Sequence, residues 1–577
     1  MAGEATTTAS TTGMSLKQQV LQRWGAMKSE RATWFQHWQE ITTYLLPRNG
    51  RYFVQDRNKG WRRHNAIFDN TGTRSLEILA AGLMGGLTSP ARPWFRLGVA
   101  DTNLMRLAPV KLWLAQCTRV MLDIFQKSNT YRVLHGMYRE LGAFGTAAAI
   151  VVQDYDNVIH LFPLTAGEYC LAQNWKGAVC TMGREFEKTV AELVKEFGID
   201  NVSSTVARMF GAGQLDKWIT VVHLVEPNAD RDASQADNTN MAWSSIYFEV
   251  GGDPNKPLRK SGFKRFTVLA PRWDVAGGDI YGNSPGMEAL GDIKQLQQEQ
   301  LRKSQGIDYM SNPPLQLPTS MKNRDVDRFP GGLTFRDSMG QGEKIETMFD
   351  VRLDLQHLLA DIQDVRSRIR GSFYADMFLM LQNDSADTRK TATEVAELHE
   401  EKMLMLGPVL ERLHNELLNP LIDITFEHMT DAGIVPPPPP ELHGMELQVE
   451  LISMLAQAQR AITTNGVDRF VGAMVQLSSV KPEVLDNLDA DYWAGDYSDM
   501  LGVDPEMVVP PEKVAAIRTA RAQAQQAAQQ SAQANQAADS AQKLAQVPTQ
   551  DGASNAANDV MGMFSGYNSS SPATTGA

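Results

Sequence analysis

Residues 353–390 read LDLQHLLADIQDVRSRIRGSFYADMFLMLQNDSADTRK, a long helical pattern that ends in a polar break. Its apolar residues recur every three or four positions, as they do along one face of a single unbroken helix. These residues are Leu355, Leu358, Ile362, Val365, Ile369, Phe373 and Met377. A helix of about thirty residues spans roughly 40 Å, more than an ordinary globular domain needs, so we expect a tall structure.

The polar break, residues 382–390, is followed by a second helical pattern that starts at Thr391. Asp387 or Thr388 can cap the start of this second helix. Pro408 should kink it, because proline removes a helical hydrogen bond. The two patterns together predict a helix, a loop and a helix in the centre of the chain.

A polar helix precedes the long one. Ser284 is its predicted cap and Pro285 its first residue, since serine favours the cap and proline the first helical position. The pattern continues to about Tyr309, and Pro313 and Pro314 stop it. Few of its positions are apolar, so we expect it to pack against other helices, from its own subunit or from another.

The first half of the chain predicts an α+β lobe. Helical spacing indicates a first helix with Trp24, Trp34 and Trp38 on one stripe, ended by Pro47. Further helices are predicted over 76–87, 109–127, 131–144 and 190–197. Short strand-like runs occur at 149–153, 158–162, 179–182, 218–225 and 245–250.

Towards the C-terminus, amino-acid composition predicts structure better than the spacing of apolar residues does. The run Pro436–Pro440 predicts a stiff polyproline linker. Ala and Gln dominate residues 511–545, where strong helix formers predict a helix that has little to bury. Residues 1–14 and 546–577 consist largely of small and polar residues, and we expect them to be disordered tails.

Charge and cysteine content exclude some classes of protein. A net charge of −12 argues against a chain whose main task is to grip nucleic-acid phosphates. Its three cysteines, Cys117, Cys170 and Cys180, show no paired framework or metal-ligand spacing, which indicates reduced thiols in a cytosolic assembly setting. No apolar run approaches the eighteen residues that a membrane helix needs, so no membrane partner is expected.

The sequence also lacks the usual signatures of catalysis. It contains no P-loop, no HExxH or GxSxG motif and no CxxC pair. Asp384 and Asp387 could bind a metal, but a polar loop carries such residues for solubility and capping as well. Because no nucleophile, base and orienting group can be identified, we expect no catalytic residues, no metal and no cofactor.

Five short motifs, taken together, resemble the head-to-tail connector, or portal, proteins of short-tailed bacteriophages. They are IFDNTG (67–72), LTSPARPWF (87–95), PRW (271–273), YGNSPGMEALGDIKQL (281–296) and TATEV (391–395). Each motif alone is weak, whereas their combination and order are far more specific. The similarity covers roughly residues 15–545.

The resemblance implies a ring, usually of twelve copies, at one vertex of the capsid. Such a ring is a passive conduit for double-stranded DNA during packaging and ejection. The implied partners are other copies of the chain, the terminase large subunit, major capsid and scaffolding proteins, and the tail adaptor or tail tube protein. The implied location is the head-tail junction of the virion, with the host cytoplasm during assembly.

By order of elements, the resemblance also implies a division of the chain. It gives a disordered tail (1–14), an α+β wing (15–280), a stem helix (281–310), a clip (311–352), a second stem helix (353–380), a tunnel loop (381–390), wing and crown helices (391–435), a crown (436–510), a barrel helix (511–545) and a disordered tail (546–577). The implied fold is therefore α+β and mostly helical.

A conduit must not hold DNA tightly, because each neutralised phosphate adds to affinity and hence to friction. An acidic ring with a few basic groups would repel the duplex on average while centring it by weak contacts. The tunnel-loop candidates are Asn383, Asp384, Asp387, Arg389 and Lys390, and the stem candidates are Lys294, Arg302 and Lys303. Alternatively, the loop cations face solvent or pair with Asp384 and Asp387, and the stem cations form salt bridges between subunits.

Two other classes of protein remain as alternatives. One is a different virion ring or an ejection protein, and the other is a nucleic-acid-processing enzyme on a helical scaffold. Images of the purified protein would separate them, since a ring of about twelve radial arms supports the portal.

Overall fold

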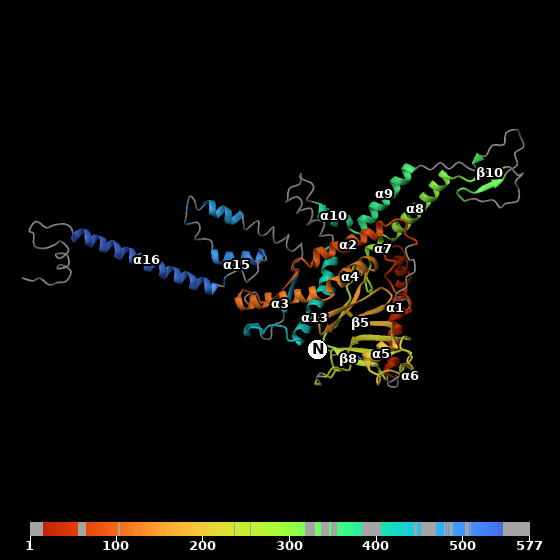
Figure 1. Ribbon diagram of the computed structural model, residues 1–577, viewed down its shortest axis with the longest axis horizontal. Helices are drawn as coiled ribbons and strands as arrows, with labels where there is room; N and C mark the ends of the chain where they lie inside the picture. The colour runs from red at the N-terminus through yellow and green to blue at the C-terminus, as the bar shows by residue number, and fades with distance from the viewer. Residues whose placement is uncertain are drawn as a thin grey trace, which may run out of the picture. The chain divides into compact units, whose positions relative to one another are not determined.

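The computed structural model in Figure 1 describes residues 15–55, 65–101, 104–232, 234–235, 237–253, 256–317, 329–335, 346–347, 355–383, 406–442, 447–451, 469–477, 481, 483, 489–501, 507, 509 and 511–545. The chain forms two compact units, Met1–Thr463 and Thr464–Ala577. In the described residues helices dominate and four small sheets accompany them, which confirms the predicted α+β, mostly helical class. None of the described helices is long and apolar enough to span a bilayer.

The first helix, α1 (Leu16–Tyr44), ends before Pro47, as the sequence predicts. Ser15 caps it in a reciprocal pair of hydrogen bonds with the third helical residue, which satisfies otherwise unpaired backbone N–H groups. Its first half packs Trp24 against a five-stranded sheet, and its second half packs Trp38 edge-on against Tyr281. The predicted tryptophan stripe therefore serves two separate cores.

Helices and a small sheet build the largest core. Leu76 and Leu79 pack against Gly142, so two helices of this core lie at close range. Trp94 stacks on Phe125 with ring centroids 5.7 Å apart. The elements are α2 (Thr71–Leu87), β1 (Phe95–Val99), η1 (Leu104–Arg106), α3 (Ala108–Lys127), α4 (Thr130–Phe144) and β13 (Leu447–Leu451), with β1 and β13 paired antiparallel. The predicted bounds of α3 and α4 are confirmed to within about one residue.

A five-stranded antiparallel sheet lies beside this core, in the order β4-β5-β6-β7-β8. Val20, Trp24 and Met27 of α1 cover one face. Two short helices cover the opposite face around Val221 and Tyr247. The elements are β4 (Tyr169–Gln173), β5 (Val179–Thr189), α5 (Val190–Phe197), α6 (Ser204–Gly211), β6 (Trp218–Pro227), β7 (Trp243–Glu249) and β8 (Arg259–Phe263).

A three-stranded sheet, in the order β3-β2-β9, links the lobe to the helices that follow. Its strands are β2 (Ala148–Asp154), β3 (Val158–Leu164) and β9 (Val268–Leu269). The sequence predicted β2, β3, β5, β6, β7 and α5 but missed β4, β8, β9 and α6. The two edge strands show no alternation of apolar and polar residues, and β9 has only two residues, so periodicity could not reveal them.

Two predicted helices are each interrupted. The helix from Pro285 is broken at Ala289, and the long helix is broken before Ala375. Tyr374 has a φ of +54°, a left-handed conformation that cannot continue a right-handed helix. The prediction of one unbroken helix was therefore wrong, because tertiary packing overrides its regular spacing. The elements are α7 (Pro285–Glu288), α8 (Leu290–Ser311), α9 (Leu355–Ser372) and α10 (Ala375–Asn383).

Three short strands lie between α8 and α9, in the order β11-β10-β12. They are β10 (Leu315–Leu317), β11 (Leu333–Phe335) and β12 (Glu346–Thr347). The preceding helix ends at Ser311, before Pro313 as the sequence predicted. The segment between the two long helices therefore contains a small sheet of its own.

After the polar break, the described chain resumes at Leu406. Pro408 lies in the first turn of α12, where proline is tolerated. We expected Pro408 to kink the helix that starts at Thr391, but the part of that helix before Leu406 lies outside the described residues. A π-helical segment and another helix follow: α12 (Gly407–Leu413), η3 (His414–Leu418), α13 (Asn419–Asp431) and η4 (Pro440–Leu442).

The second unit contains two described helices with assigned bounds, α15 (Ala490–Leu501) and α16 (Pro511–Ala545). Arg518 of α16 pairs with Asp491 of α15 at 2.5 Å. The helix predicted over 511–545 is confirmed, and almost all of its described side chains are exposed. Propensity, rather than burial, accounts for this helix.

Candidate functional site

The helices α8 and α9 form an antiparallel pair that leads to the small sheet around β10 (Figure 1). Ile293 and Leu296 of α8 and Val365 and Ile369 of α9 are buried in its seam. Arg368 of α9 forms an ion pair of 3.2 Å with Asp292, near the start of α8. The end of α9 therefore faces the start of α8, so the two helices run in opposite directions.

Asp69 anchors this helix pair to α2. Its Oδ1 accepts hydrogen bonds from the Thr71 amide and hydroxyl at 2.9 and 2.6 Å. Its Oδ2 accepts from Arg366 Nη2 at 2.7 Å and from Gln300 Nε2 at 3.1 Å. Burial alone would raise the pKa of Asp69, but the bonds from Thr71 and Arg366 outweigh it and hold the pKa below its ordinary value. The carboxylate is therefore charged and bound to both helices at neutral pH.

Gln297, on the buried face of α8, completes the anchor. Its side-chain oxygen accepts from the amides of Phe68 and Asp69 at 2.6 and 2.8 Å. Its side-chain nitrogen donates to the Asp69 carbonyl at 3.0 Å. One glutamine thus pairs with three backbone groups of the IFDNTG motif, as a strand would. This explains why a polar residue is buried in an otherwise apolar seam.

The YGNSPG motif joins the start of the helix pair to the end of α4. Ser284 Oγ donates to the Ala143 carbonyl at 2.8 Å and caps α7 by accepting from the Met287 amide at 3.0 Å. Gly145 has a φ of +73°, and a Cβ there would lie 2.0 Å from the Gly282 carbonyl oxygen. The two backbones therefore touch, which only glycine allows at this place.

The PRW motif supplies a second anchor. Arg272 is 3% exposed, and its Nη2 lies 2.6 Å from Glu416 Oε1 in the π-helical segment. Its guanidinium also donates to the carbonyls of Gly177 and Ile280 and to Gln173 Oε1. The Arg272 amide donates to Glu416 Oε2 at 2.9 Å. A buried charge with this many partners ties the segment after the polar break to the sheets.

The predicted site residues fall into two groups. Among the stem candidates, Lys294 pairs with Glu40 of α1 at 2.7 Å, while Arg302 is exposed and Lys303 is half-buried farther along α8. Among the tunnel-loop candidates, Asn383 is the last residue of α10. The remaining four, Asp384, Asp387, Arg389 and Lys390, lie outside the described residues.

Sequence reasoning missed the anchoring residues Asp69, Gln297, Arg366, Arg272 and Glu416. Three of them, Asp69, Arg272 and Gln297, lie in or next to motifs that carried the family resemblance, but their partners are 144 to 297 residues away along the chain. A signal was available in PRW, where an arginine stands directly before a tryptophan, a residue that is highly buried on average. No motif in the sequence marked Glu416 as the partner of Arg272.

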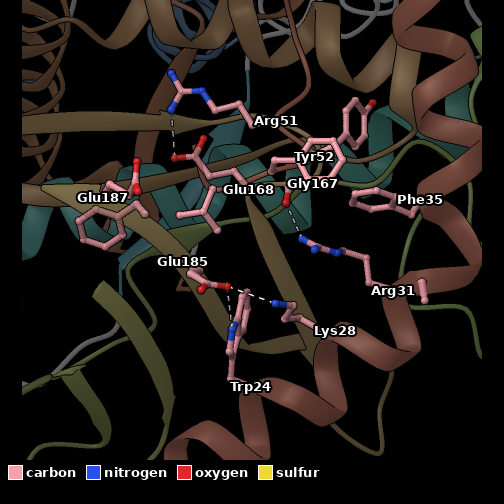
Figure 2. Close-up of a pocket in the computed structure, with 14 residues that line it drawn as sticks. Trp24, Lys28, Arg31, Phe35, Arg51, Tyr52, Gly167, Glu168, Glu185 and Glu187 are labelled. Carbon is pink, nitrogen blue, oxygen red and sulfur yellow. Dashed lines mark hydrogen bonds and ion pairs between the residues drawn. The ribbon is translucent and has the colours of Figure 1, made fainter. Parts of the chain in front are cut away.

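A pocket of 340 Å³ opens between α1 and β5, away from the helix pair (Figure 2). Its charged side chains bind one another: Lys28 pairs with Glu185 at 3.2 Å, and Arg51 pairs with Glu168 at 3.5 Å. Arg31 Nη1 donates to the Gly167 carbonyl at 2.7 Å. These contacts tie α1 to the sheet and form no arrangement of nucleophile, base and orienting group.

The part of the chain that the structure describes contains no group of three or more His, Cys, Asp or Glu side chains placed to hold a metal. Asp384 and Asp387 are not in that part.

Comparisons with known proteins agree with these motifs. A family model described as "Bacteriophage head to tail connecting protein" matches residues 17–508. The probable portal protein of Bordetella phage BPP-1 is 60% identical over 548 residues, which cover 95% of this chain and 98% of that protein. The portal protein of Salmonella phage epsilon15 is 44% identical over 537 residues, which cover 93% of this chain and 96% of that protein.

Solved structures give a weaker likeness. A chain from the neck of an empty gene transfer agent particle matches with a TM-score of 0.36 and 11% identity, over 74% of this chain and 92% of that chain. This value adds nothing to the assignment, which rests on the family match and the two relatives. The chain therefore belongs to the bacteriophage head-to-tail connecting proteins, the portal proteins of phages.

Proposed function

We propose that twelve copies of this chain form a ring at one capsid vertex and that double-stranded DNA passes through its axis during packaging and ejection. The observation that carries this proposal is the antiparallel pair of α8 and α9, anchored at one end to the lobe and carrying a small sheet at the other. Repeated around an axis, such pairs can form a wall whose lobes lie outside it. A head-to-tail contact that closes after a fixed rotation produces a ring of this kind.

In this ring the lobe of residues 15–280 is the wing. Residues 281–310 and 353–380 are the stem, and residues 311–352 between them are the clip. Residues 381–390 are the tunnel loop that faces DNA. The remaining parts are wing and crown helices (391–435), a crown (436–510) and a barrel helix (511–545), with tails at 1–14 and 546–577.

The clip would dock the terminase large subunit during packaging and the tail adaptor or tail tube protein afterwards. The wing would contact major capsid and scaffolding proteins. The ring would be assembled in the host cytoplasm and remain at the head-tail junction of the virion, away from membranes. In this role the chain is a passive conduit, with no catalytic step and no cofactor.

The charge of the chain suits a conduit. With a net charge of −12 per copy, the ring repels the duplex on average. Arg302 and Lys303 in the stem, and Arg389 and Lys390 in the tunnel loop, would centre DNA by weak, exchangeable contacts. Lys294 is held by Glu40 in the described structure, so we expect it to contribute least.

Electron microscopy of the purified protein tests the ring. We expect rings of about twelve radial arms with a central hole, and a particle mass of twelve 63.9-kDa chains by light scattering. Filaments, or monomers at all concentrations, would contradict the proposal.

A matched pair of double variants tests the channel. Arg389→Ala with Lys390→Ala should change DNA packaging or retention, whereas Lys260→Ala with Arg208→Ala in the lobe should not. Unchanged DNA content and leakage in the first variant would contradict the tunnel-loop assignment.

A further inference from the structure

A row of four side chains crosses the sheet on the face that α5 and α6 partly cover. Arg184 of β5, His223 of β6, Tyr247 of β7 and Arg259 of β8 are paired in register from strand to strand. Neighbouring strands lie about 4.8 Å apart, so the two arginine Cα atoms are roughly 14 Å apart. The row places one cation at each end and two rings in the middle.

Contacts within the row fix both arginines. Arg184 Nε donates to His223 Nδ1 at 3.3 Å, and the His223 and Tyr247 rings stack with centroids 3.8 Å apart and planes 8° apart. The Arg259 guanidinium carbon lies 4.6 Å from the Tyr247 ring centroid. The Arg184 guanidinium carbon lies 4.4 Å from the Phe186 ring centroid. A guanidinium stacked on a ring loses little further entropy when its N–H groups bind a ligand.

His223 acts here as a neutral spacer. It is 1% exposed, and its Nε2 lies 3.1 Å from Ser245 Oγ. Burial lowers the pKa of His223 well below its usual value, and the charges of Arg184 and Arg259 lower it further. The imidazole can therefore accept the Arg184 hydrogen bond at neutral pH without adding a third charge.

Within the described residues, no carboxylate forms an ion pair with Arg184 or Arg259, the cations at the two ends of the row. Lys188, which lies near both arginines, pairs with Glu196. Arg184 uses its Nε in the row and keeps the four N–H donors of its two Nη groups for another acceptor. This is a positive, preorganised surface on a chain whose net charge is −12.

We propose that this surface, the arginine platform of Arg184, His223, Tyr247 and Arg259, binds an acidic segment of a partner protein. Carboxylates match the fork of a guanidinium and bind it through two hydrogen bonds. An extended segment rises about 3.4 Å per residue, so carboxylates four residues apart have the spacing of the two arginines. Duplex DNA fits less well, because the acidic chain repels a long polyanion while the platform offers only two open cations.

The experiment measures binding of a fluorescein-labelled decaglutamate peptide to the assembled full-length protein, by fluorescence anisotropy at low salt. We expect Arg259→Ala to weaken binding about tenfold, as the loss of one charge-assisted contact does. Lys260→Ala is the matched control, because Lys260 is the next residue of β8, is also exposed and points to the opposite face. It should leave binding within about twofold of the parent.

Arg184→Lys is a third variant, since it keeps the charge but loses the planar fork, and it should weaken binding less than Arg259→Ala. Because Arg259 is exposed, Arg259→Ala should fold even if a change at Arg184 does not. Competition experiments with inorganic phosphate and with a short DNA duplex show whether the platform prefers either of these anions to the acidic peptide. The proposal is overturned if decaglutamate does not bind, if Lys260→Ala weakens binding as much as Arg259→Ala, or if the duplex binds more tightly than the peptide with the same dependence on Arg259.

Discussion

Two long helical regions of this chain are stabilised in opposite ways. The α8–α9 pair is held by buried apolar residues and by the polar anchors at Asp69 and Gln297. The helix α16 consists mostly of Ala and Gln and exposes nearly all of its described side chains. Tertiary contacts stabilise the α8–α9 pair, whereas intrinsic helix propensity stabilises α16. A substitution should therefore have a large effect at the anchors and a small, local effect in α16.

The largest effect is expected at the buried Arg272–Glu416 pair. Arg272→Ala leaves the Glu416 carboxylate without its main partner, and should lower the free energy of unfolding by about 3–5 kcal/mol. Arg265→Ala is the control, because the Arg265–Asp423 pair has the same kind of contact at 2.9 Å but is largely exposed. It should cost less than about 1 kcal/mol. Thermal unfolding would contradict the role of the anchor if both variants melted alike.

Gly82 and Gly85, on the same helix, give the next comparison. A Cβ at Gly82 would lie 2.2 Å from the Phe378 ring of α10, whereas a Cβ at Gly85 meets no atom within 4 Å. We expect Gly82→Ala to destabilise the first unit by about 1–3 kcal/mol through overpacking. Gly85→Ala should be neutral or stabilising by up to about 1 kcal/mol. Equal unfolding temperatures for the two variants would mean that α10 does not pack on α2 as described.

Glu140 should make stability depend on pH. Burial raises its pKa from 4.5 to about 7, although hydrogen bonds from Thr165 and Asn49 oppose the shift. The folded state then binds more protons than the unfolded state between about pH 4.5 and 7, so stability falls as the pH rises through that range. The slope is at most about 1.4 kcal/mol per pH unit.

Glu140→Gln removes this titration and should flatten the dependence of the unfolding temperature on pH between 5 and 7. Asp123→Asn, on an exposed carboxylate, is the control and should keep the parent's slope. If Glu140→Gln kept that slope as well, the buried carboxylate would not be the group that titrates.

The smallest effect is expected in α16. Ala528→Gly places glycine in an exposed helix and should cost about 1 kcal/mol of local helix stability, without a change in the melting of the first unit. Hydrogen exchange should show faster exchange within 511–545 alone. A loss of protection in α8 or α9 would show that the two regions are not independent.

Local patterns predicted much of this fold. Pro47, Ser284 and Pro313 mark helix ends, because caps and proline act within a few residues. The same reasoning missed the break at Tyr374, although Gly371 and Ser372 precede it and lower helix propensity. That break depends on how Phe373 and Phe378 pack on other helices, which spacing along one helix does not contain.

The candidate site was predictable only in outline. The helical patterns predicted two helices on either side of an insertion, and the structure has helices α8 and α9 with a small sheet between them in the chain. The anchors depend on pairs such as Asp69 with Arg366, nearly three hundred residues apart, which no local pattern identifies. The assignment of Arg302, Lys303 and the tunnel loop to DNA contact stays a prediction.

Photochemical cross-linking in assembled virions tests most directly whether DNA passes along the helix pair. A photoreactive residue would replace Arg302, which is exposed on α8, and in a second virus Tyr155, which is 99% exposed on the β2–β3 turn. Irradiation should join packaged DNA to the chain at position 302 and not at position 155. Adducts at position 155 alone, or none at 302 in virions that contain DNA, would contradict the channel that this account proposes.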